Sequence, residues 1–150
     1  MYSAHLQKSA RTTGLYAKVL ANIKKCVFCD LREKYIIDEK NGVVLSVNLF
    51  PYTDGQLIII PRRHIEHFKE INALEWQAIK YLTAKAFRLL KKAYQINDCW
   101  IIYREGEVAG KTVRHLHLNI IPYHQALHTW NYQKIKLEPI KAAQKLRGVV

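Results

Sequence analysis

The chain has 150 residues, of which 49% are hydrophobic and 24% are charged. This length and composition are ordinary for one globular domain that is large enough to bury a core without disulfide bonds. Lysine and arginine number 24 against 12 acidic residues, and the resulting net charge of +12 favours anionic ligands without identifying one.

Three features bear on where the protein works. The longest apolar runs, such as residues 57–60, are far shorter than the roughly 20 residues that a membrane helix requires, so we expect no membrane span. No apolar segment follows Met1, so no signal peptide is expected. The cysteine count of 3 is odd, which disfavours a secreted disulfide framework. Together these features predict a cytoplasmic protein.

The N-terminal half predicts one helix followed by three strands. Residues 9–24 form a loosely amphipathic helical pattern. Strands are then expected at residues 35–38 and 43–48, because Asn41-Gly42 between them is a strong hairpin signal. A turn at residues 51–55 leads into a third strand over residues 56–61.

A long helix is predicted next, from Asn72 to about Tyr94. Asn72 followed by Glu75 resembles a capping box in which Asn replaces Ser or Thr. Apolar residues at helical spacing predict a buried stripe made of Leu74, Ala78, Leu82, Ala86, Leu89 and Ala93.

Two further strands complete the predicted sheet, at residues 99–103 and 113–121, with a glycine-containing turn between them. Pro122 is expected to end the last strand because it lacks a backbone N–H. Five strands and two main helices predict an α+β fold with a mostly antiparallel sheet. We expect a single domain over residues 1–150, with basic extensions at both ends.

The turn before the last strand contains an apparent phosphate-binding loop. Residues 110–112 read Gly-Lys-Thr, the end of the pattern in which backbone N–H groups hold phosphates at a helix start. Gly106 is one residue too close to Gly110, and a strand rather than a helix is expected to follow. The sequence therefore excludes this type of loop.

The strand itself carries the polar residues of interest. Side chains alternate between the two faces of a strand, so His115, His117 and Asn119 share one face. The other face holds apolar residues that we expect to pack under the long helix: Leu116, Leu118 and Ile120. The pattern alone fits either a ligand site or the polar side of a half-exposed sheet.

A family resemblance adds to this pattern. Residues 109–122 (AGKTVRHLHLNIIP) resemble the signature of the histidine-triad (HIT) nucleotide hydrolases and transferases. Residues 48–64 resemble the second block of that family, especially in its fragile-histidine and dinucleoside-polyphosphate-cleaving branches. Cys26-Val27-Phe28-Cys29 is similar to an N-terminal block of many members. The blocks span residues 26–122, and the resemblance implies a HIT-like fold.

The resemblance also implies roles for individual residues. His117 matches the central histidine, which makes it the nucleophile that forms a nucleotidyl-histidine. Two positions depart from the family pattern, since Asn119 replaces the last histidine and Gln56 replaces the histidine after the glycine of the second block. The expected catalytic residues are His117, Asn119 and Thr112. The expected substrate-binding residues are Asn48 (at the ribose), Phe50, Gln56, Arg104 and Lys111.

The pair Cys26-x-x-Cys29 can be redox-active or half of a zinc site. The resemblance implies that His64 and His115 complete a tetrahedral, structural zinc site, and idle thiols are the alternative.

The implied function is hydrolysis or phosphorolysis of a nucleoside phosphate bond, with adenine nucleotides or dinucleoside polyphosphates as substrates. A nucleotide-binding sensor is an alternative, because Gln56 and Asn119 can mark lost catalysis. A relative that binds nucleic-acid ends is another alternative. The net charge of +12 favours it, but the sequence shows no zinc-finger spacing of Cys and His after the motif blocks, which disfavours it. The resemblance further implies a homodimer. In it, Trp130-Asn131-Tyr132 can reach a neighbour's site or serve as an intrachain lid.

Overall fold

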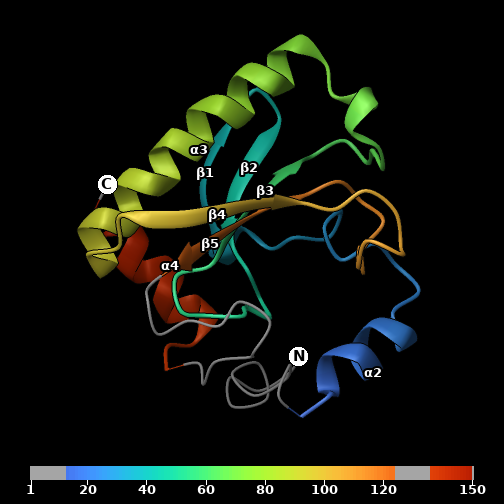
Figure 1. The fold of residues 1–150 in the computed structure, drawn as a ribbon, viewed down its shortest axis with the longest axis horizontal. Coiled ribbons are helices and arrows are strands. Elements are labelled where there is room, and N and C mark those ends of the chain that lie inside the picture. The colour runs from blue at the N-terminus through green and yellow to red at the C-terminus, as the bar shows by residue number, and fades with distance from the viewer. Residues whose placement is uncertain (1–12, 124–135, 150) are drawn as a thin grey trace.

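A five-stranded antiparallel sheet lies at the centre of the structure, a computed structural model that describes residues 13–123 and 136–149 (Figure 1). Its strand order is β1-β2-β3-β5-β4, and every neighbouring pair is antiparallel. The strands are β1 (Ile36–Lys40), β2 (Val43–Val47), β3 (Leu57–Pro61), β4 (Asp98–Tyr103) and β5 (Leu118–Tyr123). The predicted α+β fold class is confirmed.

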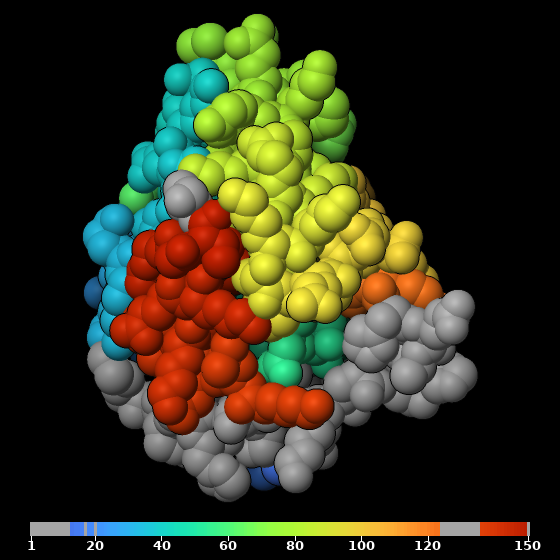
Figure 2. All heavy atoms as spheres, turned by 90° about the vertical axis from the view of Figure 1, so that its left-hand side faces the viewer, coloured from blue at the N-terminus to red at the C-terminus, as the bar shows by residue number. Residues whose placement is uncertain are grey.

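Helices α3 (Ala73–Tyr94) and α4 (Pro139–Arg147) cover one face of the sheet and lie against each other (Figure 2). Helix α2 (Leu15–Asn22) lies on the other side of the strands (Figure 1). Two short 3₁₀ helices, η1 (Glu33–Tyr35) and η2 (Phe68–Glu70), complete the elements. The sequence did not predict α4. In the described part of the chain, no helix combines the length and apolar character needed to cross a bilayer.

The predicted hairpin joins β1 to β2. Asn41 and Gly42 both have positive φ angles, 47° and 71°, which the tight two-residue turn requires. Lys40 is paired with Val43 directly across this turn. The Asn-Gly signal therefore placed the turn and the start of β2 correctly, whereas β1 runs two residues beyond its predicted end, to Lys40.

The long helix also begins where the sequence predicted. The Asn72 side chain accepts the N–H of Glu75, and the Glu75 carboxylate accepts the N–H of Asn72. The stripe was wrong at its first member, because Leu74 is 62% exposed. At about 100° per residue, Leu74 lies roughly 80° around the helix from Leu82, the centre of the buried stripe. Ile79 takes a buried position instead.

The predicted last strand was wrong at its start. It begins at Leu118, five residues later than expected, because β4 ends at Tyr103, the partner of Leu118, and the pairing with β3 reaches no further than Ile59 opposite Leu118. In the segment before Leu118, the Leu116 N–H donates to the Ile65 carbonyl, and the side chains of His115 and Arg114 bond to Pro61 and Glu66. Pro122 also lies within β5 rather than after it. It pairs with Cys99 of β4 at a point beyond the pairing with β3, so no bond needs its missing donor.

The two faces of β5 separate core from site as the alternation predicted. Leu116, Leu118 and Ile120 pack into the core that α3 covers. Asn119 is on the other face, where it pairs with Ile58 of β3. The candidate site is therefore built on the face opposite α3.

Candidate functional site

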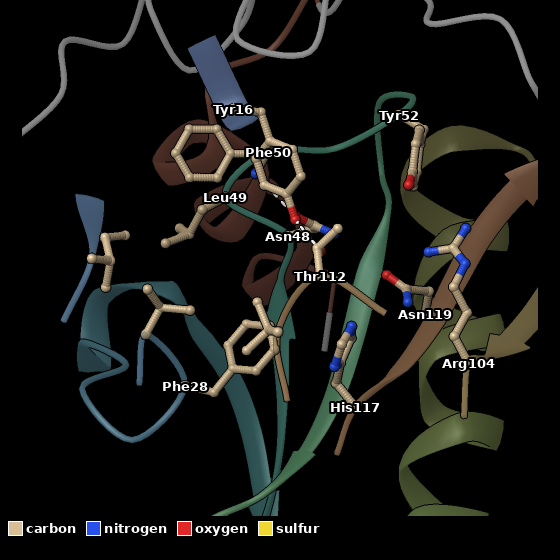
Figure 3. Close-up of a pocket in the computed structure, with 13 residues that line it drawn as sticks. Tyr16, Phe28, Asn48, Leu49, Phe50, Tyr52, Arg104, Thr112, His117 and Asn119 are labelled. Atoms are coloured by element: carbon tan, nitrogen blue, oxygen red, sulfur yellow. Dashed lines mark hydrogen bonds between the residues drawn. The ribbon is translucent and has the colours of Figure 1, made fainter. Parts of the chain in front are cut away.

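A pocket opens on this face and encloses roughly 620 Å³, part of it open to solvent (Figure 3). Its polar wall comes from the sheet and the loops beside it and consists of Asn48, Arg104, Thr112, His117 and Asn119. Its apolar wall comes largely from the N-terminal segment and the loop after β2, and consists of Tyr16, Ile23, Val27, Phe28, Leu49 and Phe50. Tyr52 and Val113 complete the lining. A pocket with one apolar and one polar wall suits a small ligand with a polar end.

His117 is half-buried on the polar wall, and its Nδ1 lies 2.9 Å from the carbonyl oxygen of His115. A carbonyl can only accept, so Nδ1 carries the proton and Nε2 keeps its lone pair. Burial lowers the pKa of His117 to about 4, which keeps the ring neutral at neutral pH. The acceptor belongs to the same segment, two residues before His117. The ring of Phe28 packs edge-on against this imidazole, with 4.9 Å between centroids.

Asn119 is 3% exposed, and its Oδ1 accepts a bond of 3.0 Å from Nε2 of Gln56. Gln56 is itself buried and does not line the pocket. Its other side-chain atom, Oε1, accepts the backbone N–H of Tyr52 at 2.6 Å. The sequence suggested that Gln56 binds the ligand, but its contacts lie behind Asn119 instead.

Arg104 brings a positive charge to the pocket. Ile102 of β4 pairs with Asn119, and Arg104, two residues further on, projects from the same face. Its guanidinium lies over the ring of Tyr52, 5.8 Å from the centroid. This cation and the amide of Asn119 are on the same side of the pocket as His117 (Figure 3).

Asn48 has a defined amide orientation. Its Oδ1 accepts the N–H of Phe50 at 2.9 Å, so Nδ2 is the atom left to donate to a ligand. Thr112 is bonded across the pocket, since its hydroxyl lies 2.8 Å from that of Tyr16 in α2. The rings of Tyr16 and Phe50 pack 5.4 Å apart and close the apolar end.

Lys111 is not part of the pocket, although the sequence placed it among the substrate-binding residues. Its side chain is nearly buried, and its ammonium donates to the carbonyl of Glu66. The chain direction at Lys111 carries this side chain towards the segment after β3 rather than towards His117.

Cys26, Cys29, His64 and His115 form a second cluster, in which one ligand atom from each residue lies within 4.8 Å of the others. Nδ1 of His115 is 3.4 Å from the Cys26 sulfur and 3.5 Å from the Cys29 sulfur. Nδ1 of His64 is 3.2 Å from the Cys29 sulfur. The four predicted ligands are therefore together and able to hold a metal ion.

The protonation of His115 suits metal binding. Its Nε2 lies 2.8 Å from the carbonyl of Pro61, so this nitrogen carries the proton. Nδ1 then keeps its lone pair and faces the two sulfurs. Burial lowers the pKa of His115, which favours the neutral ring that binds metals.

Several pocket residues were missed by the sequence analysis, namely Tyr16, Ile23, Val27, Phe28, Tyr52 and Val113. The first four come from the N-terminal segment, which no local pattern ties to the last strand. The one available signal was the Cys-x-x-Cys pair, because bringing Cys26 and Cys29 to His115 also brings Phe28 beside His117.

A scan against protein families matches the HIT domain to residues 32–126. An uncharacterized HIT-like protein of Mycoplasma genitalium is 29% identical over 111 residues, covering 71% of this chain and 79% of its own. The AP-4-A phosphorylase of Mycobacterium tuberculosis is 27% identical over 92 residues, covering 60% of this chain and 47% of its own.

Among solved structures, the fold is similar to that of a Zn-bound histidine triad family protein from Mycobacterium smegmatis. The TM-score is 0.68 at 19% identity, over 83% of this chain and 91% of that one. The family model covers well over half of the chain and includes the sheet, the polar wall of the pocket and two of the four clustered ligands. The chain therefore belongs to the HIT domain family.

Proposed function

We propose that this protein is a nucleotidyl hydrolase or transferase that cleaves a phosphate bond of an adenine nucleotide or a dinucleoside polyphosphate through a nucleotidyl intermediate on His117. The observation that carries the proposal is the orientation of His117, whose Nε2 is unprotonated and whose ring lines the pocket. A neutral, oriented imidazole is a competent nucleophile at neutral pH.

The walls of the pocket suit the parts of a nucleotide. The rings of Tyr16 and Phe50, with Leu49, offer apolar surface for a base. Asn48 has an amide N–H group available for a ribose oxygen. Arg104 and Asn119 offer a positive charge and a neutral donor for the phosphate oxygens.

The reaction that follows from these roles has two steps. The Nε2 lone pair of His117 attacks the α-phosphorus, and the bond from that phosphorus to the leaving phosphate oxygen breaks. The leaving group departs with the bonding electron pair, while Arg104 and Asn119 stabilise the charge on the non-bridging oxygens. Water, which gives up a proton to the solvent, or phosphate then attacks the same phosphorus. The bond from phosphorus to Nε2 breaks, and His117 keeps the electron pair of that bond as its restored lone pair.

Relatives support the choice of substrate class. One of them is named an AP-4-A phosphorylase, and it is similar to this chain over 92 residues. Phosphorolysis uses phosphate as the acceptor and hydrolysis uses water, so the two outcomes share the first step and differ only in the second.

We further propose that the Cys26, Cys29, His64 and His115 cluster binds a structural zinc ion. In a tetrahedral site with Zn–S near 2.3 Å and Zn–N near 2.0 Å, neighbouring nitrogen and sulfur ligands lie about 3.5 Å apart. The distances of 3.2, 3.4 and 3.5 Å fit this spacing. Four protein ligands leave no position for a substrate, so the ion would fix the Cys26–Cys29 loop to the sheet rather than take part in the reaction.

A homodimer remains a prediction. Its support is that β4 is an edge strand of the sheet with an apolar side chain, Ile101, that is 50% exposed. The second proposed contact, from residues 130–132, lies outside the described part of the chain. Light scattering on the purified protein would give the oligomeric state.

The nucleophile is tested by Asn and Ala substitutions at His117. We expect His117→Ala to lower kcat by about four orders of magnitude or more, because the intermediate cannot form. Mass spectrometry of the wild-type enzyme with a slow substrate should find one nucleotidyl group on His117. The substrates to offer are diadenosine polyphosphates and adenosine phosphoramidate, each with and without phosphate, so that the products identify the acceptor.

His67→Ala is the matched control, since His67 is exposed and bonded to Glu105 outside the pocket. It should leave turnover unchanged. Wild-type turnover by His117→Ala would exclude the proposed mechanism. Nucleotide binding by the wild type without any product would instead support the nucleotide-sensor alternative.

A further inference from the structure

We propose that Gln56 is a positioning residue that fixes which atom of Asn119 faces the substrate phosphate. The inference rests on the proposed function, since it concerns the same phosphate site. It assigns to Gln56 a role that acts through Asn119 and requires no contact between Gln56 and the ligand.

The backbone N–H of Tyr52 fixes the orientation of both amides. The N–H of Tyr52 can only donate, so the side-chain atom of Gln56 that lies 2.6 Å from it must be the oxygen, Oε1. The opposite atom of the same amide is then Nε2, which can only donate. It lies 3.0 Å from the side chain of Asn119, so the atom of Asn119 that receives it must be Oδ1.

Asn119 therefore has its Nδ2 group left for the pocket that it lines together with His117 and Arg104. An amide rotated by 180° would present Oδ1 instead, and an oxygen lone pair beside a phosphate oxygen is repulsive. The tertiary structure sets the correct orientation before the ligand arrives. A donor fixed in advance stabilises developing negative charge without the cost of reorienting it during the reaction.

Gln56 is well held for such a role. Its side chain is 2% exposed, and its backbone bonds on both sides, with the N–H donating to the Thr53 carbonyl and the carbonyl accepting the Asn48 N–H. The turn that carries Tyr52 back towards Gln56 passes through Gly55 at a φ of +80°, a conformation that favours glycine. The anchor for Asn119 thus belongs to the rigid part of the fold.

The contact also connects the two departures from the HIT pattern. Gln56 and Asn119 each stand where the family motif has a histidine, and in this structure the two amides are bonded to each other. A paired replacement keeps a donor directed at the phosphate, and an amide donor does not titrate near neutral pH as an imidazole does. The two amides are therefore one working unit rather than two separate losses.

A double-mutant cycle tests the unit, with Gln56→Met and Asn119→Leu as near-isosteric changes and the double variant completing the cycle. Each protein is checked by circular dichroism and thermal unfolding. We then measure kcat and KM for the diadenosine polyphosphate that the wild type cleaves, and the affinity for AMP by calorimetry. Gln56→Met should lower kcat by about tenfold in the wild-type background, because Asn119 loses its fixed orientation.

In the Asn119→Leu background, Gln56→Met should change kcat by less than about twofold, since no amide remains to be oriented. KM should change less than kcat, because the orientation matters most when charge develops on the phosphate. Equal losses of kcat in the two backgrounds, or full kcat in Gln56→Met, would overturn the inference.

Failure of the proposed function gives a different result. If the wild type cleaves none of the substrates but binds AMP, AMP affinities replace kcat as the quantity compared in the double-mutant cycle. Coupling between positions 56 and 119 in these affinities still supports the inference. If the affinities show no coupling, or if the wild type binds no AMP, the role assigned to Gln56 is excluded as well.

Discussion

The backbone carbonyl of His115 accepts the Nδ1 proton of His117 at 2.9 Å, while the ring of His115 belongs to the Cys26, Cys29 and His64 cluster. One residue is therefore part of both candidate sites. The other ring nitrogen of His115, Nε2, donates to the Pro61 carbonyl and fixes the orientation of the ring. A shift of His115 would move the group that orients His117, so the four-residue cluster and the pocket are structurally connected through His115.

Loss of the proposed zinc ion should therefore reduce activity, although the proposal gives the ion no part in the reaction. We expect Cys26→Ala to lower the zinc content and to reduce kcat/KM by about tenfold, a typical cost of losing the groups that support a site. The melting temperature should fall as well, because the ion no longer ties the Cys26–Cys29 loop to the sheet. Metal analysis by mass spectrometry, steady-state kinetics and thermal unfolding measure the three effects.

The third cysteine provides the control for this experiment. Cys99 lies in β4, is partly buried and is outside the cluster, so Cys99→Ala should retain about one zinc ion per chain and nearly full activity. Full activity in a zinc-free Cys26→Ala protein would contradict the connection between His115 and His117.

The fold was largely predictable because its signals are local. Asn41-Gly42 and the Asn72–Glu75 capping box each depend on residues within a few positions, and they correctly placed the β1–β2 turn and the start of α3. The start of β5 was not predictable in this way. It depends on where the pairing of β5 with β3 and β4 stops, which is a property of the sheet and not of the segment itself.

The residues of the candidate site also differ in whether local signals could predict them. Alternation along one strand placed His117 and Asn119 on the same face, and that inference needed no tertiary information. The position of Gln56 behind Asn119 depends on the turn between β2 and β3, and the position of Phe28 on the docking of the N-terminal segment. Lys111 could not be assigned from sequence, because a side chain that leaves a turn has no periodicity to orient it.

Asn119→Asp should remove the donor while keeping the shape of the side chain. One carboxylate oxygen would accept from Gln56, and the other would face the phosphate, where its negative charge is repulsive. We expect kcat to fall by about 100-fold or more, comparable to the loss of one oxyanion donor, and AMP affinity to weaken. Asn97→Asp is the control, because Asn97 is exposed after α3. Unchanged kcat in Asn119→Asp would show that Asn119 does not contact the phosphate.

Glu75 should make the stability of the protein depend on pH. Although its burial alone would raise the pKa, hydrogen bonds from Arg63 and from the Asn72 N–H lower the pKa of Glu75 below its usual value. A lowered pKa stabilises the folded state above the unfolded-state pKa of about 4.3, and this contribution is lost as the pH falls through the folded-state pKa.

Denaturant unfolding of the wild type and of Glu75→Gln at several pH values measures this contribution. The wild type should be the more stable protein near neutral pH, and the difference should shrink as the solution is acidified below about pH 4. A difference in unfolding free energy that stays constant across this range would mean that the charge of Glu75 does not contribute.

Gly55 and Gly106 have the same φ of +80° but different surroundings, so together they separate backbone strain from crowding. A Cβ on Gly106 would meet no atom within 4 Å, so Gly106→Ala should cost only the strain of a positive φ, about 1 kcal/mol. A Cβ on Gly55 would lie 3.1 Å from Leu90 and 3.3 Å from Tyr94, both in α3. Gly55→Ala should therefore cost roughly 1–3 kcal/mol more, measured by denaturant unfolding.

Gly55→Ala should also affect the proposed phosphate site. The turn through Gly55 holds the Tyr52 N–H against Gln56, so a displaced turn would release Gln56 and, through it, Asn119. We expect Gly55→Ala to lower kcat under conditions where the protein remains folded, and Gly106→Ala to lower it less. Equal unfolding free energies and equal kcat for the two variants would show that the close packing of Gly55 against α3 matters neither for the fold nor for the site.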